Sequence, residues 1–283
     1  MSAPMVRAIL GGQKSQTRRI VSPANSVLNG FAARAADWER LDYEDAFVDP
    51  GPSPAGNPGP YLKVARPDDQ TRHRVYPRWW LGDRLWVREA HSIVRETLDY
   101  ETGGEFDAFE WEEIYGDPRK YLNGCARTGL RSGVYYPADG QDLCPSNMFP
   151  CLSIDGKVLL RKKEISWRPS IHMPRWASRL TLEITDIRAE RLQDISEEDA
   201  RAEGVEQVVR PPSWPVMYER RFWKGYENHQ KANRDSARES FGSLWNSLHG
   251  PGAWSANPWV WAISFRAHRT NIDALPAQRE AAE

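Results

Sequence analysis

The segment LTLEITDIRAERLQDISEEDARAEG, residues 180–204, contains a strand pattern followed directly by a helix pattern. Apolar and polar residues alternate over 180–192, which predicts a β-strand with one buried face. Ser196 then precedes three acidic residues, a combination typical of a helix N-terminus, where a side-chain oxygen caps free amides and acids face the positive end of the dipole. Gly204 is suited to ending that helix. A strand that leads into a short helix is therefore predicted.

Outside this segment, regular patterns are short and scattered along the chain. A helix is predicted over Pro4–Leu10, with Gly11-Gly12 at its end, and another over Ser236–Leu248. Strands are predicted over 17–21, over 84–88 after a turn at Gly82-Asp83, and over 257–266. We therefore expect one α+β domain over 1–269 and a flexible tail over 270–283. Its core segments are 1–22, 80–94, 178–204 and 235–269, and its large loop insertions are 23–79, 95–177 and 205–234.

Composition restricts the class of protein. The chain has 283 residues, 27% charged and 40% hydrophobic, which is typical of a globular protein with a sizeable core. Its formal net charge of −1 argues against a broad electropositive groove for duplex DNA or long RNA. We find no signal-peptide pattern and no apolar run of roughly 20 residues that would cross a membrane. The three cysteines, Cys125, Cys144 and Cys151, fit no disulfide framework, so a soluble protein of the reducing cytoplasm with no membrane partner is expected.

The stretch GGQKSQTRRIV, residues 11–21, has the residue types of a hydrolytic site. On a strand, Thr17 and Arg19 would share one face, and Lys14 would approach from the preceding turn. A threonine hydroxyl becomes a nucleophile when a base removes its proton, and lysine is a base only when it is neutral. Desolvation and neighbouring cations such as Arg18 favour that neutral form. The alternative is a charged loop that closes a pair of strands.

Four features together resemble the ASCH domain, a small β-barrel related to the PUA fold of RNA-binding modules. They are the motif Gly12-x-Lys14-x-x-Thr17-x-Arg19, the pair Gly82-Asp83, the helix over 196–204 and the strand over 259–265. The resemblance covers about a third of the chain, and the segments around 167–205 and 250–265 are similar to ASCH proteins of phages and prophages. It implies a small PUA-like β-barrel flanked by short helices.

Within this superfamily, the small bacterial N4-acetylcytidine amidohydrolases are similar at functional positions. The resemblance implies that Lys14, Thr17 and Glu203 are catalytic, with threonine as nucleophile, lysine as base and glutamate assisting. It also implies a small nucleoside substrate and no cofactor. This chain is much longer than those enzymes, and Ser15 stands where they often carry threonine. An RNA- or modified-base-binding module, or a ribonuclease, of phage or prophage origin is the alternative function.

The substrate-binding residues are expected among basic and aromatic side chains. Arg19, Tyr136, His172 and Trp176 are the predicted pocket residues. The segment 159–176 interleaves basic residues with two tryptophans, which suits single-stranded RNA or a nucleotide, although a solvated face over buried tryptophans has the same pattern. The six histidines follow no metal-binding spacing, so no metal site is predicted. RNA is the second-ranked partner, and nothing in the sequence indicates the oligomeric state.

Overall fold

A computed structural model describes most of the chain, with gaps between its ranges. The described residues are 1–29, 35–52, 59–68, 71–94, 97–98, 105–106, 133–135, 151–152, 158–159, 168–212, 217–226 and 233–276. The chain divides into two compact units. The first comprises Met1–Arg7, Trp86–Thr181 and His268–Glu283, and the second comprises Ala8–Leu85 and Leu182–Ala267. The predicted ASCH-like domain over 1–269 stays a prediction, and its core segments divide between the two units.

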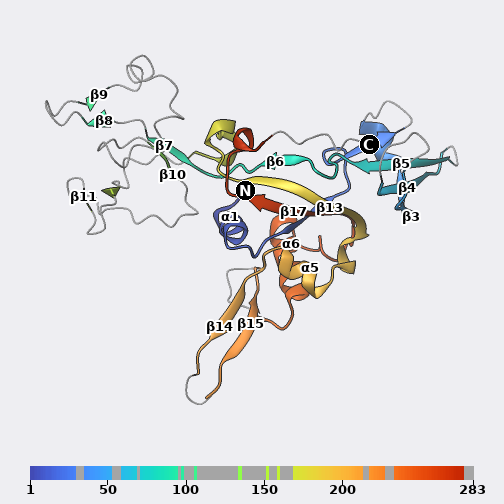
Figure 1. The fold of residues 1–283 in the computed structure, drawn as a ribbon. Helices are drawn as coiled ribbons and strands as arrows, with labels where there is room; N and C mark the ends of the chain where they lie inside the picture. Colours follow the sequence, from blue (N-terminus) through green and yellow to red (C-terminus); the bar gives the residue numbers. More distant parts are fainter. Residues whose placement is uncertain are drawn as a thin grey trace. The chain divides into compact units, whose positions relative to one another are not determined.

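The predicted α+β class is confirmed, since the described elements are mostly antiparallel strands with a few helices (Figure 1). The sheet that holds the sequence motif has the strand order β1-β17-β13-β6. Its strands are β1 (Gln16–Ile20), β17 (Trp259–His268), β13 (Thr181–Arg191) and β6 (Arg84–Trp86). β1 pairs antiparallel with β17, and Thr17 lies opposite Ile263. Each of these strands falls in a segment where the sequence predicts one.

The second unit contains another four-stranded sheet, formed by residues 26–77. This sheet corrects the prediction that residues 23–79 form a loop insertion. Its strand order is β2-β5-β4-β3. The strands are β2 (Ser26–Asn29), β5 (Thr71–Pro77), β4 (Tyr61–Arg66) and β3 (Asp42–Asp49), and the short helix α2 (Ala35–Glu39) lies between β2 and β3. Proline and glycine are concentrated in the connection between β3 and β4, so the average composition of the whole segment conceals the strands on either side.

The two four-stranded sheets share the core of the second unit. Trp261 of β17 is fully buried, and its indole Nε1 donates to Ser26 Oγ of β2 at 2.9 Å. Residues of both sheets form one apolar cluster: Val21, Leu28, Trp38, Leu41, Leu62, Val64, Val75, Ile184, Ile187, Ala189, Trp261 and Ile263. Ile263 and Trp261 lie opposite Thr17 and Arg19 across the β1–β17 pair, so this face of the first sheet is the one that packs on the core.

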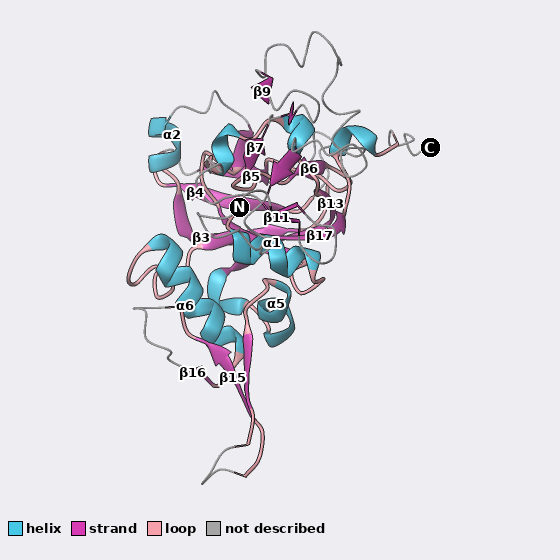
Figure 2. Ribbon diagram, turned by 90° about the vertical axis from the view of Figure 1, so that its left-hand side faces the viewer, coloured by secondary structure: helices cyan, strands magenta, loops and turns pink. Residues whose placement is uncertain are grey.

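Two helices of the second unit, α5 (Glu197–Ala202) and α6 (Ala237–His249), lie side by side (Figure 2); α5 contacts β1, and the ring centroid of Phe241 in α6 lies 5.8 Å from the Arg18 guanidinium carbon. α5 begins after Ser196, whose Oγ accepts from Asp199 N at 3.0 Å. α6 begins after Ser236, whose side chain accepts from Glu239 N. The Ser196 cap and the helix over 236–248 were predicted and are confirmed. The predicted insertion over 205–234 contains another small sheet, with the order β14-β15-β16 and the strands β14 (Gln207–Arg210), β15 (Arg220–Lys224) and β16 (Asn233–Arg234).

The first unit contains short strands and 3-10 turns. β7 (Ser92–Val94) pairs with β10 (Gly133–Tyr135), and the other strand pairs described here are β8 (Thr97–Leu98) with β9 (Glu105–Phe106) and β11 (Cys151–Leu152) with β12 (Val158–Leu159). The helix α1 (Ala3–Leu10) begins in this unit and ends in the other. Where a flexible tail was predicted from residue 270, the Asn271 side chain donates to the carbonyls of Arg175, Trp176 and Ser178. No helix in the described ranges is long and apolar enough to span a membrane.

Candidate functional site

Lys14 is held at the junction between α1 and β1. Gly12 takes a φ of +70° just after the helix, and the amide of Lys14 donates to Ala8 O at 3.0 Å. Lys14 then forms an isolated antiparallel bridge with Glu203. Gly204 has a φ of +83°, and a Cβ at this position would lie only 2.9 Å from the Cβ of Lys14. Glycine therefore meets two requirements at position 204, a left-handed backbone and close contact with the lysine.

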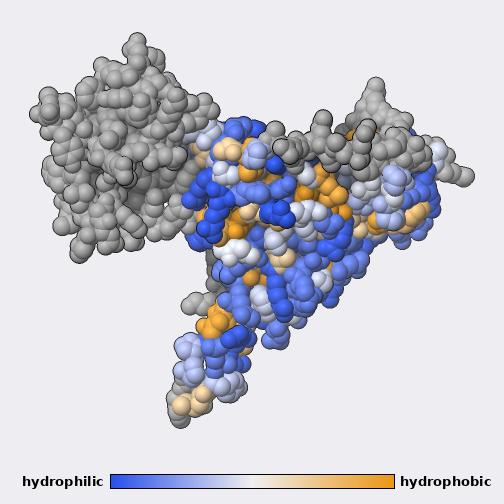
Figure 3. Space-filling model, in the orientation of Figure 1, coloured by the Kyte–Doolittle hydropathy of each residue, from blue (hydrophilic) through white to orange (hydrophobic). Residues whose placement is uncertain are grey.

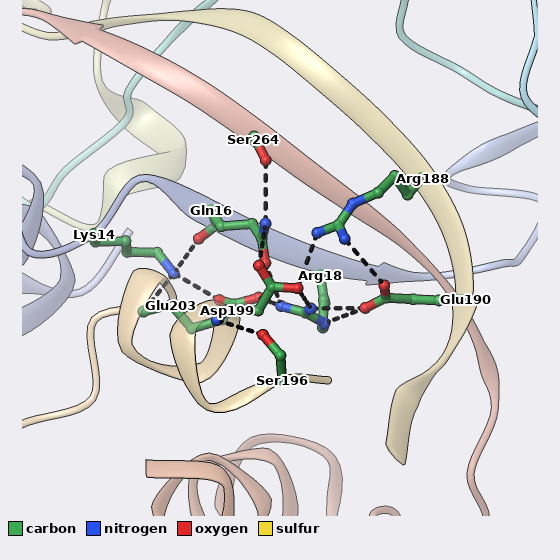
Figure 4. Close-up of polar contacts among 9 residues, drawn as sticks. All are labelled: Lys14, Gln16, Arg18, Arg188, Glu190, Ser196, Asp199, Glu203 and Ser264. Carbon is green, nitrogen blue, oxygen red and sulfur yellow. Dashed lines mark hydrogen bonds and ion pairs between the residues drawn. The ribbon is translucent and has the colours of Figure 1, made fainter. Parts of the chain in front are cut away.

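The Lys14 ammonium is buried and has three acceptors (Figure 4). Its Nζ donates to Gln16 O at 2.9 Å, to Glu203 O at 2.8 Å and to Glu203 Oε2 at 2.8 Å. An ammonium has three N–H donors, whereas a neutral amine has two, so only the charged lysine satisfies all three acceptors. The pair is therefore a charged ion pair, with both side chains about 5% exposed.

Arg18 lies beside this pair and bonds to three carboxylates. Its Nη1 donates to Glu203 Oε1 at 3.2 Å, its Nη2 donates to Asp199 Oδ2 at 3.2 Å, and its Nε and Nη2 both donate to Glu190 Oε1, at 2.9 and 2.6 Å. The Arg18 side chain is fully buried. Asp199 and Glu203 lie four residues apart on one side of α5, where two acids repel. The guanidinium offsets that repulsion because it bonds to both.

Gln16 and Arg188 complete the network of polar side chains. The Gln16 amide donates to Asp199 Oδ1 and to Ser264 Oγ, each at 3.1 Å, and its carbonyl accepts from Arg18. Arg188, 45% exposed, donates to Asp199 Oδ2 at 2.9 Å from the solvent side. We call the set Lys14, Gln16, Arg18, Arg188, Glu190, Asp199 and Glu203 the ion-pair network. It has three cations and three anions, so its charges balance.

Thr17 does not belong to this network. Side chains alternate along a strand, so Thr17 and Arg19 lie on the opposite face of β1 from Gln16 and Arg18. Thr17 is half-buried and Arg19 is exposed. Among the described residues, the Thr17 hydroxyl has no hydrogen bond to Lys14 or Glu203. The Lys14 ammonium does bond to the carbonyl of Gln16, the residue directly before Thr17.

The structure places the other described pocket residues, His172 and Trp176, in two 3-10 turns. His172 is exposed in the 3-10 turn η4 (Ser170–His172), and Trp176 packs half-buried against Met173 and Ala177 in the turn η5 (Arg175–Ala177). Both belong to the first unit, whereas Lys14, Thr17, Arg19 and Glu203 belong to the second. Tyr136 lies outside the described residues, as do residues 160–167 of the basic segment.

Gln16, Glu190 and Asp199 were not predicted to belong to a site, and Arg18 was predicted only as a nearby cation. A signal was present, because Lys14, Gln16 and Arg18 are spaced by two and therefore point to one face of a strand. Three polar residues on one face need polar partners once that face is covered. The acids of α5, four residues apart, are suitable partners.

Comparisons with known proteins found no match: no family model fits the chain, and no curated protein or solved structure is detectably similar to it. The resemblance to ASCH proteins consequently depends on the motif and the similar segments of the sequence alone.

Acid should weaken the ion-pair network before it weakens the apolar core. Burial raises the pKa of Asp199, but the hydrogen bond and charge of Arg188, the hydrogen bond of Gln16 and the charge of Arg18 outweigh burial and leave the pKa below its usual value. A carboxylate with a depressed pKa contributes stability that is fully present above the unfolded-state pKa and lost as the pH falls through the folded-state value. We expect the free energy of unfolding, measured with urea, to be flat near neutrality and to fall below about pH 4.

The Asp199→Asn variant tests the assignment of this acid sensitivity. It should be less stable than the wild type at pH 7, and its stability should decline less steeply below about pH 4, because its amide does not titrate. The same substitution at Asp49 is the matched comparison for the other sheet, because hydrogen bonds from Lys63 and Tyr61 lower the pKa of Asp49 to about 2. Equal acid slopes for wild type and Asp199→Asn would show that Asp199 does not contribute.

Proposed function

We propose that this chain is a metal-independent amidohydrolase that removes the acyl group from N4 of acylated cytosine nucleosides, and that its first sheet is part of a PUA-like ASCH barrel. The supporting observation is the buried Lys14–Glu203 pair, in which the ammonium bonds to the peptide carbonyl directly before Thr17. A lysine and a carboxylate placed beside a strand threonine provide a base, a proton acceptor and a hydroxyl nucleophile.

The proton path begins along the existing bond between Lys14 Nζ and Glu203 Oε2. Transfer of one proton over this 2.8 Å contact gives a neutral amine and a neutral carboxyl. The amine then takes the proton of Thr17 Oγ as the oxygen attacks the acyl carbonyl carbon. Arg18 opposes the first transfer because its bond to Glu203 Oε1 favours the carboxylate. The neutral pair is thus a minor state that forms when substrate excludes water.

Collapse of the tetrahedral intermediate breaks the bond between the acyl carbon and N4. The nitrogen leaves with a proton from the lysine–glutamate pair, and the cytosine ring delocalises its electrons. Arg19, two residues from Thr17 on the same face of β1, is placed to hold the oxyanion or the base carbonyl. Water then hydrolyses the threonine ester, which releases the carboxylic acid and restores the hydroxyl. In a variant of this scheme, Thr17 positions a water molecule that attacks directly.

A binding role without turnover is the second candidate. The observation that favours it is the mutual satisfaction of the ion-pair network, since Lys14 has three acceptors and both Glu203 oxygens are occupied. Buried charges that are fully paired are also typical of purely structural contacts. In this case a PUA-like module would hold RNA or a modified base and leave it unchanged.

Ultraviolet monitoring of N4-acetylcytidine with the purified protein separates these candidates. We expect loss of the acetylated chromophore and release of cytidine, unaffected by prior dialysis against EDTA. Hydroxylamine should trap an acyl-threonine if Thr17 is the nucleophile, and trap nothing if water attacks directly. A chromophore that persists through long incubation, with bulkier N4-acyl nucleosides also intact, would contradict the hydrolase proposal. Loss of activity on EDTA treatment, restored by a divalent cation, would contradict metal independence.

A further inference from the structure

The hairpin formed by β14 and β15 extends from the helices of the second unit (Figures 1 and 2). Its base is fixed to α6, because Ser240 Oγ donates to Lys224 O at 2.6 Å and Tyr226 N donates to Ser243 Oγ at 3.0 Å. We call residues 206–226 the arm. In the described surface, the arm is mostly hydrophilic with small apolar areas (Figure 3). The ion-pair network uses none of its residues, so the arm has no role in the proposed chemistry.

One face of the arm places two arginines around an aromatic ring. Arg210 and Arg220 lie directly opposite each other across the strand pair, and Val208 lies opposite Phe222. The guanidinium carbon of Arg220 is 4.7 Å from the Phe222 ring centroid, and that of Arg210 is 5.5 Å from it. Both arginines are exposed. Like charges directly opposite one another destabilise a strand pair, so this arrangement favours an anion between them.

Charge pairing in the arm leaves these two arginines without an acidic partner. The arm contains four basic and two acidic side chains. Both acids are engaged elsewhere, because Glu219 pairs with Arg221 at 2.8 Å and Glu206 pairs with Lys224 at 2.8 Å. No carboxylate in the described part of the chain pairs with Arg210 or Arg220. The excess positive charge of the arm is therefore located on this one face.

We propose that the arm binds the phosphodiester backbone of a single-stranded nucleic acid, with one phosphate between Arg210 and Arg220. Arginine forks match phosphate oxygens, and stacking of both guanidiniums on Phe222 holds them in place beforehand. Tyr218, 66% exposed, offers a ring on which a base can stack. A pair of arginines beside an exposed ring suits one strand better than a duplex, and it agrees with a chain whose overall charge is near zero.

Fluorescence anisotropy with a labelled 12-residue oligouridylate and the full chain tests the proposal. We expect binding at low salt that weakens as salt is raised. The double variant Arg210→Gln/Arg220→Gln should bind at least about tenfold more weakly, and its logarithmic salt dependence should be shallower by about 1.4, the value for two contacts on a single strand. The control variant Arg221→Gln, on the opposite face of the same strand, should stay within about twofold of the wild type.

Further ligands identify the partner class. An oligothymidylate of equal length that binds equally well supports recognition of the backbone, and a preference for oligouridylate supports RNA in particular. The proposal is overturned if the wild type does not bind at low salt, if the double variant binds as tightly as Arg221→Gln, or if polyglutamate or a duplex competes as well as the single strand.

All substituted arginines are exposed, so circular dichroism should show unchanged folding. Binding to the arm does not require turnover, so a negative hydrolase assay would not affect the interpretation of the binding measurement.

Discussion

Replacement of Arg18 with methionine should lower the free energy of unfolding by about 3–5 kcal/mol. The Arg18 side chain is fully buried and bonds to Glu190, Asp199 and Glu203. Methionine fills a similar apolar volume, but it leaves three carboxylates with fewer partners in a region of low dielectric. An uncompensated buried charge is more destabilising than the intact network is stabilising. Urea unfolding followed by tryptophan fluorescence measures the loss.

Arg188→Met is the matched control for this prediction. Arg188 also bonds to Asp199 and lies 4.0 Å from Glu190, but its side chain is 45% exposed and water replaces it readily. We expect a loss of about 1 kcal/mol or less for this variant. The comparison tests the effect of burial, because both substitutions remove one guanidinium from Asp199 and Glu190. Similar losses for the two variants would mean that the network is not buried in solution as it is in the structure.

Local sequence signals were sufficient to predict the helices and strands around the ion-pair network. Ser196 is the cap of α5, as predicted, because capping depends on a few neighbouring residues, and the apolar spacing of 236–248 identifies α6. The strand alternation of 180–192 and of 257–266 likewise identifies β13 and β17. The burial of Lys14 against Glu203 could not be predicted from local patterns, since 189 residues separate the two. Only the resemblance to ASCH proteins suggested that they act together.

The second sheet shows where composition misleads. Residues 23–79 appear irregular because the connection at 49–60 is rich in proline and glycine, yet β4 and β5, which follow it, form a regular antiparallel pair. Leu62 and Val75 lie opposite each other in that pair and are fully buried. A search for strands in a short window after the prolines could have found them. The packing of this sheet against β13 and β17 joins residues far apart in the sequence, so a short sequence window cannot predict it.

On the hydrolase proposal, Thr17→Val should reduce turnover of N4-acetylcytidine by roughly 10³-fold or more, because it removes the hydroxyl and keeps the shape. Thr17 lies in β1 opposite Ile263, and valine suits such a strand position, so folding should be unchanged. Thr17→Ser keeps the nucleophile and should retain measurable turnover. Ser15→Ala removes an exposed hydroxyl two residues away and should have no effect.

The position of Thr17 across β1 from the ion-pair network makes this comparison decisive. If Thr17 is the nucleophile, Lys14 must exchange its bond to Gln16 O for one to the threonine hydroxyl, which lies one peptide unit further along the strand. Thr17→Val would then abolish the hydroxylamine adduct together with turnover. If Thr17 only positions water, turnover falls without any adduct in the wild type. If Thr17→Val keeps full turnover, the hydroxyl has no part in the reaction, and the lysine–glutamate pair must act through water on the opposite face of the strand.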